Sequence, residues 1–221
     1  MVQLTYAYYQ NEGKTIEVAE KELMFSMGKA YDLYKYLLSV LVRMKTLAEQ
    51  KDAAFRARNK RLQTHTDDVT PDGRFAANLF LAQLAENKEL GEYIEKQKQD
   101  WIEEDAFLKK TYTKFMENDV FRFYLDKEDY TYEADREVVR KLYKTCICNN
   151  EDFDSLLEDH SLYWNDDKDI IDSFVLKTIK RFNEASTPEQ PLLPEFASDE
   201  DREFAVKLFR TTLERGMEMR Q

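Results

Sequence analysis

The sequence at residues 16–44 reads IEVAEKELMFSMGKAYDLYKYLLSVLVRM. Apolar side chains recur in it at intervals of three and four residues, which is the spacing of one face of an α-helix. These positions are Ile16, Ala19, Leu23, Met27, Ala30, Leu33, Tyr34, Leu37, Leu38, Leu41 and Met44. Thr15 is a suitable N-cap. The pattern therefore predicts an amphipathic helix of unusual length that runs on to Leu62.

The remainder of the chain is also typical of helices. Its 221 residues include only 5 Gly and 4 Pro, which leaves few turn-forming residues for a sheet protein. Leu, Glu, Lys, Ala and Arg, all good helix formers, are abundant. Only residues 119–125 allow an interpretation as a strand, and a helical turn fits them equally well. The sequence predicts an all-α fold, a multi-helix bundle.

The sequence points to a cytoplasmic protein. No run of about 18 apolar residues occurs, so we expect no membrane-spanning helix. The first residues lack the apolar core of a secretory signal. The two cysteines, Cys146 and Cys148, are one residue apart, which suits neither an easy disulfide nor a complete zinc site.

The formal net charge of −11 argues against a protein that neutralises nucleic acid over a broad basic surface. Positive charge is concentrated at one place, where Arg56, Arg58, Lys60 and Arg61 fall within six residues. Two interpretations stay open. The cluster is either a solvated helix end, where cations favour the C-terminal dipole, or a set of basic RNA contacts.

No candidate for catalysis or metal binding passes its chemical test. Residues 13–15 (GKT) resemble the end of a phosphate-binding loop, but Tyr8 stands where that loop needs a glycine. Residues 165–176 alternate like an EF-hand loop but lack its central glycine and final glutamate. His65 and His160 are the only histidines and offer a nucleophile no partnered base. We predict no enzymatic activity, no cofactor and no metal.

Two segments near the ends of the chain carry a family resemblance. Residues 2–10 read VQLTYAYYQ and resemble the first helix of NusB, the all-helical bacterial transcription antitermination factor. Residues 201–216 read DREFAVKLFRTTLERG and resemble the NusB helix in which an aspartate, an aromatic residue and paired apolar residues precede a glycine. The sequence between them resembles the long helical insertion of the extended NusB-like proteins of the Bacteroides group.

The resemblance implies both a fold and a function. It implies a NusB-like helical fold with a long helical insertion, and an RNA-binding protein that acts in transcription regulation. NusB recognises a short single-stranded RNA signal, boxA, together with the ribosomal protein NusE, and helps the transcription complex pass terminators on ribosomal RNA operons. By position, Gln3 and Tyr6 correspond to first-helix residues near the RNA- and partner-binding surface of the family.

This chain also departs from the family pattern. The arginine-rich lead-in to the first helix has no counterpart before Val2, and the C-terminal bundle of the family would follow Gln221. We therefore expect an N-terminal helical region at 1–183, a Pro-containing linker at 184–197, and the incomplete start of the C-terminal helical segment at 198–221.

A further expectation concerns the apolar residues of the last helix, Phe204, Leu208, Phe209 and Leu213. With half of the second bundle missing, they should form an exposed apolar face through which the chain self-associates as a homo-oligomer. An alternative function follows from the charge alone: an acidic helical scaffold that docks a basic protein and binds no RNA.

Overall fold

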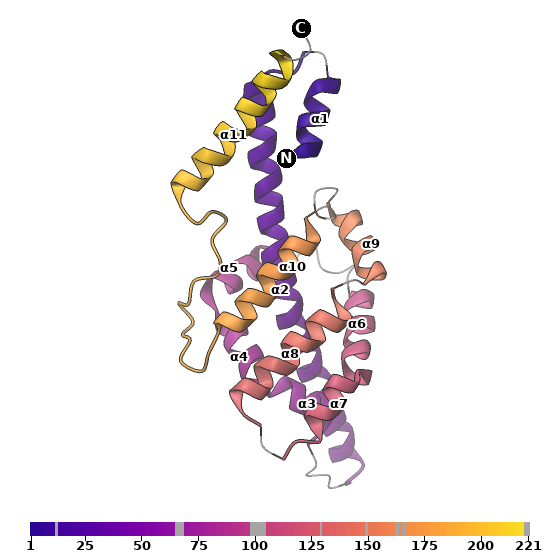
Figure 1. Cartoon of the computed structure of the whole chain (residues 1–221). Coiled ribbons are helices and arrows are strands. Elements are labelled where there is room, and N and C mark those ends of the chain that lie inside the picture. The colour runs from indigo at the N-terminus through magenta and orange to yellow at the C-terminus, as the bar shows by residue number, and fades with distance from the viewer. Residues whose placement is uncertain are drawn as a thin grey trace. The chain divides into compact units, whose positions relative to one another are not determined.

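The computed structural model describes residues 1–11, 13–64, 69–97, 105–128, 130–148, 150–161, 164 and 167–218. Within these ranges every regular element is an α-helix and no strand occurs, which confirms the predicted all-α fold (Figure 1). None of these helices has the length and apolarity needed to cross a membrane. The helices are α1 (Val2–Gln10), α2 (Ile16–Arg61), α3 (Pro71–Ala76), α4 (Leu79–Glu86), α5 (Lys88–Gln97), α6 (Asp105–Glu117), α7 (Asp119–Leu125), α8 (Tyr132–Cys146), α9 (Glu151–His160), α10 (Lys168–Arg181) and α11 (Asp199–Glu218).

Contacts divide the chain into two compact units. The terminal unit combines residues 1–32 with residues 193–221, and the central unit consists of residues 33–192. Helix α2 supplies residues to both. The contacts thus group the two ends of the chain together, whereas the three segments expected from the sequence are consecutive; that segmentation stays a prediction.

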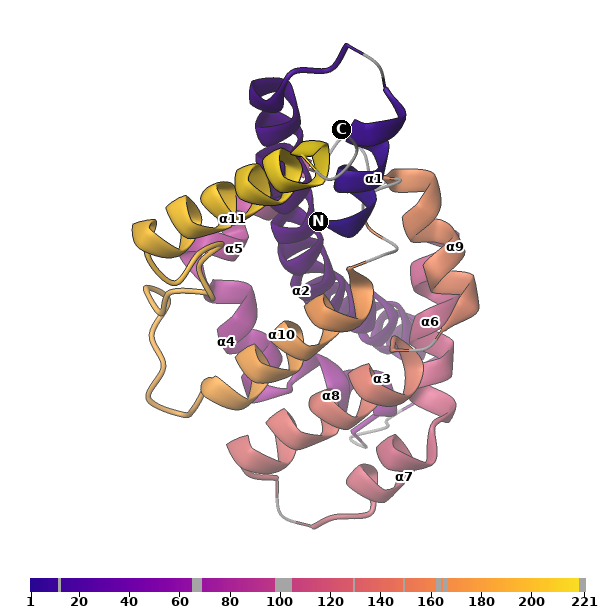
Figure 2. The same ribbon diagram turned by 45° about the horizontal axis from the view of Figure 1, so that its top comes forward.

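The terminal unit contains α1, the first part of α2, and α11 (Figure 2). Its buried core consists of Tyr8, Ala19, Leu23, Phe209 and Leu213, and Leu4, Tyr9, Ile16 and Met27 pack against this core. All three helices contribute, so none of them buries its apolar side without the other two. Ser198 followed three residues later by Asp201 is the spacing of a helix cap, and the Ser198 hydroxyl accepts a hydrogen bond from the Asp201 amide at 3.2 Å, at the N-terminus of α11.

In the central unit, α2 is covered on all sides. Residues 36–41 are all buried, although a helix that packs through a single stripe would expose some of them. Its neighbours contact it from several directions. The Tyr34 hydroxyl lies 2.6 Å from the Thr178 hydroxyl of α10, and Trp164 packs against the Tyr36 ring with 5.1 Å between centroids. The predicted length of the helix is confirmed, whereas its burial is more complete than one apolar face implies.

The sequence suggests a single short helix over residues 74–85, and this prediction is wrong. The structure has two helices there, α3 and α4, separated at Asn78. The Asn78 side chain caps α4 by accepting a hydrogen bond from the Leu81 amide at 2.9 Å. The Leu79 amide donates to the buried carboxylate of Asp135 on α8 at 2.7 Å. A partner distant in sequence therefore takes the amide that a continuous helix would have used.

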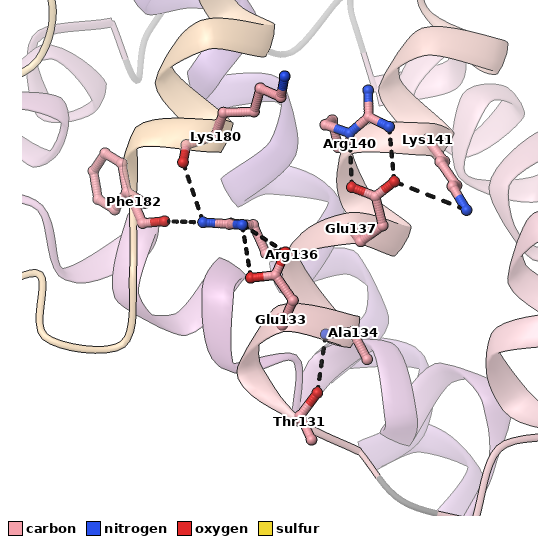
Figure 3. Close-up of polar contacts among 9 residues, drawn as sticks. All are labelled: Thr131, Glu133, Ala134, Arg136, Glu137, Arg140, Lys141, Lys180 and Phe182. Atoms are coloured by element: carbon pink, nitrogen blue, oxygen red, sulfur yellow. Dashed lines mark hydrogen bonds and ion pairs between the residues drawn. The ribbon is translucent and has the colours of Figure 1, made fainter.

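Helix α8 contacts α4, α7 and α10, and one arginine links it to the end of α10. Arg136 donates to the carbonyl oxygens of Lys180 at 3.1 Å and Phe182 at 2.6 Å, while Glu133 holds the same guanidinium through both carboxylate oxygens (Figure 3). The last carbonyl groups of a helix lack partners within it. Arg136 supplies partners for two carbonyls at this end of α10, which ties the two helices together.

Buried tyrosines should make the central unit sensitive to alkali. Burial, reinforced by a hydrogen-bonded aspartate in each case, raises the pKa of Tyr112, Tyr124 and Tyr143 well above the ordinary value. The folded state therefore keeps protons that the unfolded state releases above about pH 10. We expect the unfolding free energy to be unaffected below that pH. Above it, the free energy should fall by about 1.4 kcal/mol per pH unit for each such tyrosine.

Far-ultraviolet circular dichroism and tyrosinate absorbance, followed together through an alkaline titration, check this prediction. The three buried tyrosines should ionise at a higher pH than the others, in the same pH range in which helicity is lost. Complete ionisation of all tyrosines with helicity intact would contradict it.

Candidate functional site

The outward side of α1 carries the two residues singled out by resemblance. Gln3 is exposed, and the Tyr6 side chain is 67% exposed. Because they are three residues apart on a helix, both lie on one side of α1. Tyr8 and the partly buried Leu4 belong to the opposite, core-facing side. The structure thus brings Gln3 and Tyr6 together on a solvent-facing surface of the terminal unit.

Helix α11 holds α1 in this orientation. The Tyr9 hydroxyl donates to the Leu213 carbonyl oxygen at 2.9 Å, and the Thr212 carbonyl lies 3.3 Å away. An ion pair fastens α11 to α2, with the Arg210 guanidinium donating to both carboxylate oxygens of Glu20 at 2.6 and 2.8 Å. The hydrogen bond from Arg210 lowers the pKa of the Glu20 carboxyl. The surface that bears Gln3 and Tyr6 therefore depends on contacts between residues that are 190 to 204 positions apart in the sequence.

The basic cluster lies in the other unit, at the C-terminal end of α2. Arg56, Arg58, Lys60 and Arg61 are all exposed. Arg56 donates to Asp52 at 2.7 Å and thereby lowers the pKa of that carboxyl. The other three form no ion pair or hydrogen bond through their side chains with any residue in the described ranges. Gln3 and Tyr6 thus belong to the terminal unit, and the four cations belong to the central unit.

The central unit also buries a charged group, but its geometry is that of a structural contact. Lys168 is 5% exposed, and its ammonium donates to Asp172 at 2.8 Å and to the Ile147 carbonyl at 3.3 Å. The Tyr143 hydroxyl donates to the other oxygen of Asp172. Buried charges need partners of this kind. The arrangement links α8 to α10, and a second carboxylate, Asp154 of α9, lies 3.3 Å from the same ammonium.

The cysteines are unsuited to nucleophilic chemistry. Burial raises the pKa of the Cys148 thiol to about 12, and the nearby Asp172 carboxylate acts in the same direction, so the thiol stays protonated at neutral pH. Cys146 is buried and free. Among the described residues, no group of three or more His, Cys, Asp or Glu side chains could hold a metal ion. His65 lies outside those residues.

No model of a known protein family, no curated protein and no solved structure matches the chain. Functional proposals for it therefore rest on its own residues and on the way they pack.

Sequence reasoning missed the role of Tyr9 and Gly216. A β-carbon added at Gly216 would come within 1.7 Å of the Tyr9 hydroxyl oxygen and 2.6 Å of the ring carbon that bears it. Only a glycine lets the Tyr9 ring pass this close to the α11 backbone. A glycine inside an otherwise helical segment, at a position where alanine would favour the helix, was the available signal.

Gly216→Ala should loosen α1 from α11. Alanine raises helix propensity by up to about 1 kcal/mol, but displacement of Tyr9 loses its hydrogen bond and adds overpacking of about 1–3 kcal/mol. We expect a net destabilisation of the terminal unit by up to about 2 kcal/mol, seen as faster amide hydrogen exchange in α1. Gly91→Ala is the matched control, because a β-carbon at that helical glycine would meet nothing within 4 Å.

The control should be neutral or stabilising by up to about 1 kcal/mol. Equal exchange in α1 for Gly216→Ala and the unmodified chain would show that Tyr9 is not confined by the glycine.

The expected apolar face of α11 is only partly present. Phe204 and Leu208 are 65% and 45% exposed, but Phe209 and Leu213 are fully buried in the core of the terminal unit. The expectation that all four are exposed is therefore wrong for the second pair, because α1 and α2 cover them. Self-association stays a prediction that now rests on Phe204 and Leu208. Light scattering at high concentration should show a mass above that of one chain, and Phe204→Asp should return it to that of a monomer.

Proposed function

We propose that this chain is a NusB-like transcription antitermination factor, or a portion of one. It binds boxA-type RNA together with NusE and supports antitermination on ribosomal RNA operons. One observation carries the proposal. The two segments that resemble NusB, residues 2–10 and 201–216, pack against each other in one unit, through Tyr8, Phe209 and Leu213. Most of the sequence between them, which resembles the insertion, forms a unit of its own at residues 33–192, while residues 11–32 and 193–200 belong to the terminal unit.

The chemistry of the α1 surface also supports this proposal. Single-stranded RNA is commonly recognised by stacking of its unstacked bases on aromatic side chains and by hydrogen bonds to their edges. Tyr6 offers an exposed ring for stacking. The Gln3 amide, beside it on the helix, can both donate and accept hydrogen bonds with a base edge or with the backbone of a protein partner.

The test is a titration of the full chain with a boxA-type RNA oligonucleotide and a scrambled oligonucleotide of the same composition. It is run with and without NusE and at two salt concentrations. We expect binding that favours the boxA sequence and strengthens when NusE is present. Equal binding of both oligonucleotides, or no binding of either with NusE present, would contradict the proposal.

Variants of α1 make the test specific to the surface. Tyr6→Ala should weaken boxA binding by roughly 5- to 150-fold, because stacking on one base is worth about 1–3 kcal/mol. Phe123→Ala, on α7 of the central unit, is the matched control, since this aromatic side chain is 72% exposed and lies outside residues 2–10 and 201–216. A Tyr6 variant that binds as well as this control would remove α1 from the interface.

The alternative proposal is an acidic scaffold, supported by the net charge of −11. A scaffold should bind a basic protein with an affinity that falls with salt, and it should ignore both oligonucleotides. The same titration therefore separates the two functions.

A further inference from the structure

The last turns of α2 extend beyond the packed part of the central unit. Every side chain from Ala53 to Arg61 is exposed except Asn59, which is half-buried. Phe55 lies in this stretch and is 42% exposed. Leu62, the residue that follows α2, is 62% exposed. We call residues 53–62 the projecting end of α2.

A small set of contacts anchors the helix just before this segment. Asp52 accepts a hydrogen bond from the Thr70 hydroxyl at 2.7 Å, and Thr70 in turn caps α3 by accepting from the Gly73 amide at 2.8 Å. The Lys51 ammonium lies 4.9 Å from the centre of the Tyr112 ring. Among the described residues, the side chains of Phe55, Arg58, Lys60 and Arg61 make no hydrogen bond, ion pair or ring contact, and Arg56 bonds back to Asp52. The alanines and the terminal cations of the projecting end keep it helical without tertiary packing.

The exposed side chains of the projecting end have a defined chemistry. Arg58, Lys60 and Arg61 carry three positive charges within four positions, and no acidic side chain in the described ranges compensates them. Phe55, Arg58 and Leu62 follow one another at helical spacings of three and four, so the aromatic ring and a guanidinium share one side of the helix. Cations beside an exposed aromatic ring are what proteins use to hold single-stranded nucleic acid without reading its sequence.

The local charge and the exposed ring together favour a nucleic acid as the partner. In a chain of net charge −11, Arg58, Lys60 and Arg61 are cations that no acidic side chain of the described residues compensates, and they attract an anionic group such as a phosphate. We propose that the projecting end of α2 is a sequence-independent contact for the sugar-phosphate backbone of single-stranded RNA. Arg58, Lys60 and Arg61 neutralise phosphates, and Phe55 stacks on a base. This inference rests on the proposed RNA-binding function and adds to it a second contact, supplied by the central unit.

The experiment compares the full chain with the triple variant Arg58→Gln/Lys60→Gln/Arg61→Gln. Three phosphate contacts on a single strand contribute about 2 to the slope of log affinity against log salt. The triple variant should lose that slope, so the fall in affinity across a fourfold rise in salt should shrink by about 16-fold. The loss should be the same for boxA and scrambled RNA, which leaves the preference between them unchanged.

A matched control changes the net charge equally at exposed lysines elsewhere in the central unit, Lys127→Gln/Lys144→Gln/Lys177→Gln. This control should keep the salt slope of the unmodified chain. Phe55→Ala should weaken binding to both RNAs by roughly 5-fold or more, and Phe123→Ala should not. Because all the substituted side chains are exposed, circular dichroism and thermal melting should match those of the unmodified chain for all four variants.

The outcomes separate this inference from the proposed function. If the chain prefers boxA RNA and the triple variant binds like its control, the projecting end is not an RNA contact and the proposed function stands. If the chain binds both RNAs equally and the triple variant alone loses the salt slope, the contact stands and boxA recognition fails. Loss of NusE binding with RNA binding intact would make the projecting end a protein site and overturn the inference. No RNA binding by the unmodified chain, with NusE present, would overturn both.

Discussion

Replacing Asp135 by alanine should lower the unfolding free energy of the central unit by about 3–5 kcal/mol. Asp135 is completely buried. Its carboxylate accepts hydrogen bonds from the Arg74 guanidinium, the Tyr124 hydroxyl and the Leu79 amide. Removal of the carboxylate leaves a nearly buried arginine without its counter-charge, and a helix N-terminus without the acceptor that separates α3 from α4.

Among the described residues, Asp135 is the one carboxylate that forms an ion pair with the Arg74 guanidinium. The guanidinium is stacked 3.5 Å from the centre of the Tyr130 ring and lies 5.0 Å from that of Tyr124. These rings favour a cation over their faces, but they do not replace a carboxylate. The expected loss therefore comes mainly from an uncompensated buried charge, and less from the missing hydrogen bonds themselves.

Tryptophan fluorescence during urea unfolding measures this effect, because both tryptophans belong to the sequence of the central unit. Asp126→Ala, at an exposed carboxylate, is the control and should stay within about 0.5 kcal/mol of the unmodified chain. The double variant Arg74→Met/Asp135→Leu should be much less destabilised than Asp135→Ala, because neither charge is left buried alone. Equal unfolding midpoints for Asp135→Ala and Asp126→Ala would refute the assignment of Asp135 as a central contact.

Phe209→Ala should destabilise the terminal unit by about 3–5 kcal/mol. The Phe209 ring is fully buried in the core that joins α1, α2 and α11. Truncation leaves a cavity among residues from three helices, and α1 has only nine residues with which to stay attached. A helix this short is not stable in water by itself. We therefore expect α1 to detach, and boxA binding through Gln3 and Tyr6 to fall with it.

Hydrogen exchange is the suitable measurement, since neither tryptophan reports on the terminal unit. Amides of α1 and α11 should exchange much faster in Phe209→Ala, while those of α8 and α10 keep their protection. Leu208→Ala is the control on the same helix. Its side chain is 45% exposed, so the change should cost less than about 1 kcal/mol and leave α1 protected. Uniform loss of protection in both units, or none in α1, would show that Phe209 does not act as the anchor of α1.

Several helices could be predicted to the residue from local signals. A turn signal at residues 11–13 and the apolar spacing of residues 132–146 predict helices over Val2–Gln10 and Tyr132–Cys146, and α1 and α8 have these bounds. At these helices the periodic apolar positions and the flanking residues are close in sequence, so the information is local. The break at Asn78 was missed because half of its cause is Asp135, on another helix. No pattern within residues 74–85 reveals that acceptor.

Some features of the candidate binding residues could likewise be predicted from the sequence, and others could not. Gln3 and Tyr6 could be named from a resemblance in nine residues, and the cations at the end of α2 from their spacing alone. The exposure of the last turns of α2, and of Phe55 within them, required the structure.

The sequence by itself determined the helical class, the length of α2 and the position of most helix ends, because helix periodicity and capping act over a few residues. Only the tertiary structure decided that residues 2–10 and 201–216 share one core, and that Tyr9 lies against Gly216. It also decided which apolar residues of α11 are buried. These features depend on side chains that meet across more than two hundred residues, 204 in the case of Tyr9 and Leu213. Packing of that kind follows from shape and burial in three dimensions, which no local pattern encodes.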